Sequence, residues 1–152
     1  MRPELADTLA HLDEVARRAG VSPILFGTAV LELCGIGAFR ASDLDVIVDT
    51  RGARALAAAA GITFKSGGGS DRFRSSVHFH LDGAPLAIDV MADMSISTGE
   101  GWVPYEVQNT VEIAADGHQF LTASLADLRR FYCLARRAKD EAKIAALEAA
   151  IG

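Results

Sequence analysis

The sequence predicts an α/β protein of the α+β kind, with a mixed sheet, helices mainly on one side of it and a C-terminal helical element. Three observations lead to this prediction. Apolar residues recur at helical spacing near the N-terminus, short β-rich runs occupy 24–26 and 44–48, and residues 72–81 alternate between apolar and polar side chains. A chain of 152 residues, half of them hydrophobic, suits one domain with one core.

Helices and strands alternate through the first part of the chain. Leu5, Leu9 and Leu12 begin a helical spacing that ends at Gly20, and an alanine-rich helical stretch ends at Gly61. The expected elements are a helix over 5–19, a strand over 24–26, a helix over 28–36, a strand over 44–48, a helix over 53–60 and a short strand over 62–64. A glycine-rich loop follows over 66–70 and lacks the Lys-Ser/Thr of a phosphate-binding P-loop, so it is interpreted as a linker or flap.

A hairpin is expected next, because Asp82-Gly83 is a favourable two-residue turn between the alternating run 72–81 and an apolar run over 84–91. This turn pairs Leu81 with Ala84 and Ser76 with Asp89.

The remaining elements are weaker. Residues 96–109 are expected to be irregular, and a second hairpin is expected over 110–114 and 119–121. Ser124 followed by Asp127 resembles a helix N-cap, so C-terminal helices are expected over 124–151.

Composition limits the possible partners. The net charge of −5 argues against nonspecific nucleic-acid binding over the whole surface. The apolar runs are too short to span a bilayer and the N-terminus shows no secretory signal, so a cytoplasmic protein without a membrane partner is expected. Cys34 and Cys133 lie in apolar stretches and are expected to be buried free thiols. Basic residues gather near the C-terminus and form either a solvated helix face or a local basic site: Arg129, Arg130, Arg136, Arg137, Lys139 and Lys143.

Two aspartates open the second strand. Asp43 and Asp45 lie two residues apart, so their side chains point to the same face while Leu44 points to the core. Adjacent carboxylates repel each other unless a cation lies between them, and hard oxygen ligands suit Mg²⁺. An exposed pair of aspartates at the start of a strand is the simpler alternative, since Asp-x-Asp alone is common.

A third carboxylate, Asp89, lies within an otherwise apolar strand. The predicted register places it on the polar face beside Ser76, near Arg74 and His78. A carboxylate in this position needs a partner, which is either Arg74 in a structural ion pair or a metal shared with the first two aspartates. His78 and His80 share a strand face and are weaker candidates for a transition-metal site, because exposed strand residues explain them equally simply.

Gly27 and Thr28 stand between the first strand and the following helix. A glycine there lets the backbone approach a ligand, and the helix N-terminus favours phosphate. A tight strand-to-helix turn would require only the glycine, so both interpretations stay open.

Taken together, Phe26-Gly27-Thr28, then Ser42-Asp43-Leu44-Asp45, and a later strand aspartate at Asp89 resemble the DNA polymerase β-like nucleotidyltransferase superfamily. The run Arg137-Ala138-Lys139-Asp140 resembles an element of abortive-infection-type bacterial nucleotidyltransferases. The resemblance implies a nucleotidyltransferase-like fold.

The resemblance also implies an activity, the transfer of a nucleoside monophosphate from a nucleoside triphosphate such as ATP. The acceptor would be a protein, a transfer-RNA end or a small-molecule hydroxyl. Mg²⁺ or Mn²⁺ would be held by the catalytic residues Asp43, Asp45 and Asp89. The nucleotide-binding residues would be Gly27, Thr28, Arg74 and Lys139.

Two alternatives remain at this stage. The helix before Arg137 offers Phe131-Tyr132-Cys133 where the family often carries a lysine, which favours a nucleotide-binding module with weakened catalysis. An interaction protein of the toxin–antitoxin type is the other alternative.

Overall fold

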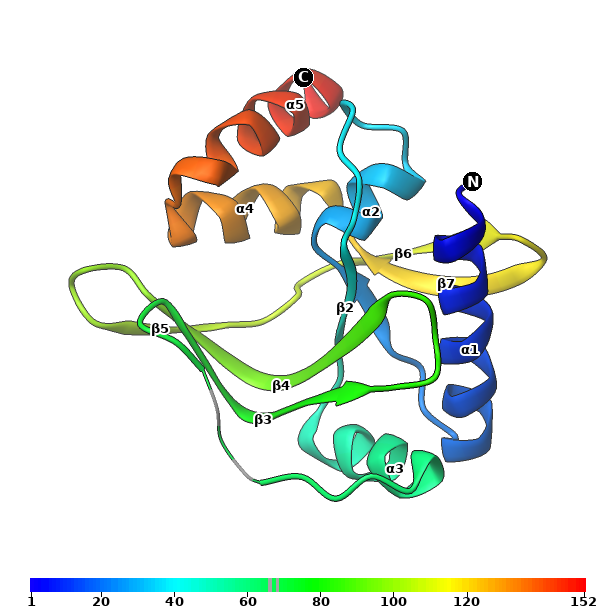
Figure 1. The fold of residues 1–152 in the computed structure, drawn as a ribbon. Helices are drawn as coiled ribbons and strands as arrows, with labels where there is room; N and C mark the ends of the chain where they lie inside the picture. Colours follow the sequence, from blue (N-terminus) through cyan, green and yellow to red (C-terminus); the bar gives the residue numbers. More distant parts are fainter. Residues whose placement is uncertain (66, 68) are drawn as a thin grey trace.

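The computed structural model describes residues 1–65, 67 and 69–152, and within them the chain forms a seven-stranded mixed sheet flanked by helices (Figure 1). The strands are β1 (Ile24–Phe26), β2 (Asp43–Ile47), β3 (Phe73–Leu81), β4 (Ala87–Ser97), β5 (Trp102–Tyr105), β6 (Thr110–Ala115) and β7 (His118–Ala123). The helices are α1 (Pro3–Ala19), α2 (Thr28–Leu33), α3 (Thr50–Ala60), α4 (Leu125–Ala135), the 3₁₀ turn η1 (Ala138–Asp140) and α5 (Glu141–Ile151). The strand order is β3-β4-β2-β1-β7-β6, with β5 paired to β4.

The two faces of the sheet differ in character. Strands β2 and β4 run parallel and in register, so Leu44 lies beside Ile88 and Asp45 beside Asp89. Leu44 and Ile88 are fully buried on the core face, where α1 and α3 pack. The aspartates point to the opposite face, and Figure 1 shows α3 on one side of the β3–β4 hairpin and α4 and α5 on the other. The mixed α/β architecture with a C-terminal helical element is as predicted.

The register predicted for the β3–β4 hairpin is wrong. The strands are joined by a longer loop over 82–86, Leu81 pairs with Ile88, and His80, not Ser76, lies opposite Asp89. The displacement is four residues along the pair, an even number, so each side chain keeps its predicted face. Asp89 therefore lies on the face opposite Phe79, as expected.

Several other boundaries differ from the prediction. Strand β4 continues to Ser97 and β5 covers part of the stretch expected to be irregular. Helix α2 ends at Leu33, and residues 62–64 form no strand. The two cysteines are less buried than expected: Cys34 follows the end of α2 and is exposed, and Cys133 lies in α4 and is half-buried. Of the predicted loop over 66–70, residues 66 and 68 lie outside the described residues.

The predicted C-terminal helical run is broken at Arg136, which adopts a left-handed conformation (φ 50°) after α4. The chain then passes through η1 before α5 begins. This break reverses the direction of the chain and brings η1 and α5 back over α4 (Figure 1).

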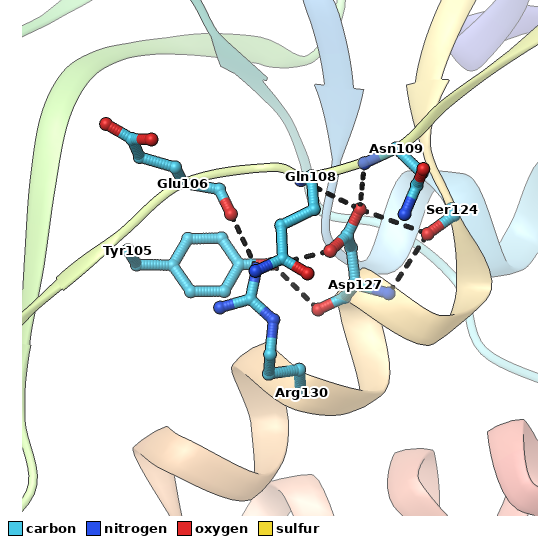
Figure 2. A network of polar contacts seen from close by, with 7 residues as sticks. All are labelled: Tyr105, Glu106, Gln108, Asn109, Ser124, Asp127 and Arg130. Carbon is cyan, nitrogen blue, oxygen red and sulfur yellow. Dashed lines mark hydrogen bonds and ion pairs between the residues drawn. The ribbon is translucent and has the colours of Figure 1, made fainter.

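Asp127 anchors the start of α4 to the segment that follows β5 (Figure 2). Its carboxylate Oδ2 accepts hydrogen bonds from the backbone N–H groups of Gln108 (3.1 Å) and Asn109 (2.7 Å). Its backbone N–H donates to the Ser124 hydroxyl, as the predicted N-cap requires, and Arg130 lies 3.2 Å from Oδ1. The side chain is 3% exposed, so this network is a buried polar anchor for α4.

Among the residues that the structure describes, no helix is both long enough and apolar enough to cross a membrane.

Candidate active site

Three carboxylates converge on the sheet face opposite α1 and α3. Asp43 and Asp45 project from β2, and Asp89 projects from the neighbouring strand β4, directly beside Asp45. One oxygen from each carboxylate lies within 4.8 Å of the others, and all three side chains are half-buried. The pleat of β2 and the parallel β2–β4 register produce this cluster, because in-register residues on neighbouring strands share a face.

The cluster is electrostatically unfavourable on its own. Burial raises the pKa of Asp45 to about 8, and repulsion from Asp43 and Asp89 adds to the shift. Burial also raises the pKa of Asp43, again with repulsion from Asp89, while Lys139 acts in the opposite direction. Both shifts have the direction expected for carboxylates that are crowded together away from solvent without a cation between them.

A divalent cation fits this donor set. Three convergent carboxylates offer only oxygen ligands, which suit Mg²⁺ or Mn²⁺ better than softer metals. Arg74, the alternative partner of Asp89, places its guanidinium 3.8 Å from the centre of the Trp102 ring instead.

Gly27 makes room for the cluster. Its φ of +73° favours glycine, and a Cβ atom at this position would lie 2.7 Å from Asp45 Oδ2. Any other residue would therefore clash with the Asp45 carboxylate and strain the backbone. Gly27 lies between the end of β1 and the start of α2 at Thr28, so this glycine both forms the strand-to-helix turn and leaves room for the Asp45 carboxylate.

A cavity of about 630 Å³ opens over the three acids. All seven site residues expected from the sequence line it: Gly27, Thr28, Asp43, Asp45, Arg74, Asp89 and Lys139. A larger hollow of about 1160 Å³ contains none of these seven and adjoins the cavity through Met91 and Met94.

The cavity also has a basic wall that the sequence prediction captured only in part. Arg137 and Lys143 line it together with Lys139 but were not among the expected nucleotide-binding residues. Burial lowers the pKa of Lys143, and repulsion from Arg137 and Lys139 contributes. The i, i+4 spacing of Lys139 and Lys143 is the sequence signal for a shared helical face.

Arg137 is held in place by a buried carboxylate. Its guanidinium donates two hydrogen bonds, of 2.7 and 2.9 Å, to Asp140, whose side chain is 0% exposed. The same guanidinium lies 5.0 Å from the centre of the Phe73 ring. Arg137 is therefore positioned from both sides at the edge of the cavity.

An aromatic wall completes the cavity. The rings of Phe73 and Phe131 stack with their centres 5.5 Å apart and their planes 14° from parallel. Phe131 also meets Phe26 edge to face, with ring centres 4.8 Å apart. The three rings come from β3, α4 and β1. These elements are far apart in the sequence, so no local sequence pattern predicts that the rings meet.

The metal-free protein is expected to lose stability as the pH rises from 5 to 9. Because the pKa of Asp45 is higher in the folded state than in the unfolded state, the associated stability is present below about pH 4 and is lost as the pH rises through about 8. Chemical denaturation across this range measures the effect. Asp45→Asn is expected to flatten the profile, and an unchanged slope in that variant would contradict the assignment.

Comparison with known proteins supports the fold. No protein-family model and no curated protein sequence matches the chain. Among solved structures, the chain is similar to a proposed nucleotidyltransferase from Thermotoga maritima, with a TM-score of 0.69 and 18% sequence identity over 95% of this chain and 92% of that chain. At this identity the likeness shows that the chain has a nucleotidyltransferase-like fold.

Proposed function

We propose that the protein is a metal-dependent nucleotidyltransferase that moves a nucleoside monophosphate group from a nucleoside triphosphate to a hydroxyl acceptor. The observation that supports this most strongly is that one cavity is lined by both a cluster of acidic side chains and a cluster of basic ones. Asp43, Asp45 and Asp89 form the acidic wall, and Arg137, Lys139 and Lys143 form the basic one. A polyphosphate with bound divalent cations has the complementary charges for both walls.

The roles follow from this arrangement. The three aspartates would hold Mg²⁺ or Mn²⁺, and the bound cations would neutralise charge on the reacting phosphates. Asp89 would also accept the proton of the acceptor hydroxyl, because its carboxylate lines the cavity beside the other two aspartates.

The nucleotide would lie against the rest of the cavity. Lys139 and Arg137 would bind its phosphates together with Gly27 and Thr28, which line the same cavity. The apolar rings that line the cavity offer an apolar surface for the base, and the exposed Arg74, held over Trp102, lies at its rim. The adjoining hollow beyond Met91 offers space for the acceptor.

One observation favours an active enzyme over a weakened nucleotide-binding module. The helix before Arg137, where the family often carries a lysine, has Phe131-Tyr132-Cys133 here. Lys143 of α5 lies beside this segment, with its Nζ 5.1 Å from the centre of the Tyr132 ring, and it lines the cavity. The positive charge is thus supplied by the next helix in the chain.

Mg²⁺ together with a nucleoside triphosphate is expected to raise the melting temperature of the wild-type protein by several degrees, because both bind the folded state alone. The Asp43→Asn/Asp45→Asn variant is expected to lose this stabilisation. Differential scanning fluorimetry with each of the four triphosphates measures it. Equal stabilisation of both proteins would reject a metal site at these residues.

Turnover is tested separately by pyrophosphate release. Incubation with each labelled triphosphate, Mg²⁺ and cell extract is expected to release pyrophosphate and to label an acceptor. Nucleotide binding without pyrophosphate release from any triphosphate would instead support the module with lost catalysis. Absence of both binding and release would favour an interaction protein.

A further inference from the structure

A second set of metal-binding side chains meets the acidic cluster at Asp89. His78 and His80 lie two residues apart on β3, so both imidazoles project from the sheet face that carries Asp89. Nε2 of His80 contacts Asp89 Oδ1, and Nε2 of His78 lies 3.6 Å from the same oxygen. The two imidazole rings meet edge to face with their centres 5.5 Å apart. Two ring nitrogens therefore converge on one carboxylate oxygen.

This convergence requires a proton or a cation between the groups. A neutral imidazole nitrogen that carries a lone pair repels a carboxylate oxygen, and Asp89 Oδ1 is buried without a hydrogen bond of regular geometry in the described part of the chain. The bridging charge is either a proton on an imidazole or a metal ion. The ligand atoms of His78, His80 and Asp89 all lie within 4.8 Å of one another, a spacing that a small adjustment brings to a common ion.

We propose that His78, His80 and Asp89 form a second metal site that binds a transition-metal ion of the Zn²⁺ class. Imidazole nitrogen with one carboxylate favours Zn²⁺, whereas an all-oxygen set favours Mg²⁺. Three protein ligands leave a coordination position for water or substrate. The histidine side chains are 37% and 57% exposed, so an ion reaches the site from solvent.

The two sites share a single residue. Asp89 belongs to both ligand sets, and its carboxylate has two oxygens with which to serve them. The histidine site therefore lies at the edge of the proposed catalytic cavity, which His78 also lines. The inference goes beyond the proposed transfer reaction and is tested by metal binding, so it stands or fails independently of turnover.

Isothermal titration of tag-free protein with Zn²⁺, in the presence of saturating Mg²⁺, tests the site. The wild-type protein is expected to bind one equivalent of Zn²⁺, and His78→Gln/His80→Gln is expected to bind it more than about 100-fold more weakly. Asp43→Asn/Asp45→Asn is expected to retain Zn²⁺ binding, because it leaves all three ligands in place. Co²⁺ substituted for Zn²⁺ is expected to give a visible absorption band that the double histidine variant lacks.

His118→Gln is the matched control. His118 is also a partly exposed strand histidine beside a carboxylate, with its Nδ1 2.8 Å from Asp13 Oδ2, but it lies outside the cavity. This variant is expected to bind Zn²⁺ like the wild type. The single variant His80→Gln, at the more exposed position, is also expected to weaken Zn²⁺ binding. It provides a second test if the double histidine variant does not fold. Melting curves in chelator show whether each variant is folded.

Three results would overturn the site. The first is Zn²⁺ binding by His78→Gln/His80→Gln within about twofold of the wild type. The second is an equal loss of binding in His118→Gln. The third is a wild-type protein that binds no Zn²⁺, which would leave a protonated histidine–Asp89 ion pair as the explanation for the contact.

Discussion

Asp45→Asn is expected to lower nucleotidyl transfer by on the order of 100-fold or more while raising the melting temperature of the metal-free protein. Loss of one charged ligand weakens the electrostatic stabilisation of the transition state by several kcal/mol, and about 1.4 kcal/mol corresponds to each factor of ten in rate. The same substitution removes the carboxylate whose pKa is raised to about 8 by burial and by its acidic neighbours. Stability and activity should therefore move in opposite directions.

Pyrophosphate release and thermal melting in chelator measure the two effects on the same samples. Asp116→Asn is a suitable control, because it removes the same charge from the exposed β6–β7 turn. Asp116 has a φ of 51°, a conformation that asparagine tolerates well, so little change in either quantity is expected. A lower melting temperature of metal-free Asp45→Asn would mean that the carboxylate is a structural residue.

Asp127→Ala is expected to destabilise the protein by about 3 kcal/mol, because it leaves two backbone N–H donors without their acceptor and removes the carboxylate that pairs with Arg130. For a chain of this size the melting temperature should fall by roughly 10 °C. Urea denaturation measures the free energy directly. The effect should reach the cavity as well, because α4 carries Phe131 and precedes Arg137.

Two comparisons make this prediction specific. Ser124→Ala removes the N-cap hydrogen bond and the bond from the Ser124 hydroxyl to the Asp127 carboxylate, but it leaves the two backbone donors and Arg130 paired, and it is expected to cost about 1 kcal/mol. Burial acts to raise the pKa of Asp127, but the hydrogen bonds from Asn109, Arg130, Gln108 and Ser124 outweigh it and lower the pKa. The contribution of this carboxylate is therefore lost as the pH falls through its folded pKa, and the difference between wild type and Asp127→Asn should shrink in acid. A constant difference would show that its charge is not involved.

Local sequence rules were sufficient for the orientation of the acids. The two-residue period of a strand places Asp43 and Asp45 on one face wherever the strand lies in the sheet. The same period explains why Asp89 was assigned to the correct face although its cross-strand partner was not. An error of four residues is a multiple of two, so it changes the partner from Ser76 to His80 without changing the face.

Local rules also identified the ends of several helices. A glycine that adopts the left-handed conformation ends α1 at Gly20 and α3 at Gly61, and Ser124 caps α4 through its own side chain. These signals act within a few residues, so they need no knowledge of the rest of the chain.

Only the tertiary structure decided which groups meet in the cavity. The parallel pairing of β2 with β4 places Asp89 beside Asp45, and the longer β3–β4 loop sets the register that brings His80 to Asp89. The left-handed turn at Arg136 folds α5 back, which carries Lys143 to the ring of Tyr132. Strand order, loop length and the direction of a returning helix are set by the free energy of burying the whole core. That free energy depends on contacts between distant segments, so the sequence around any one of these residues does not reveal it.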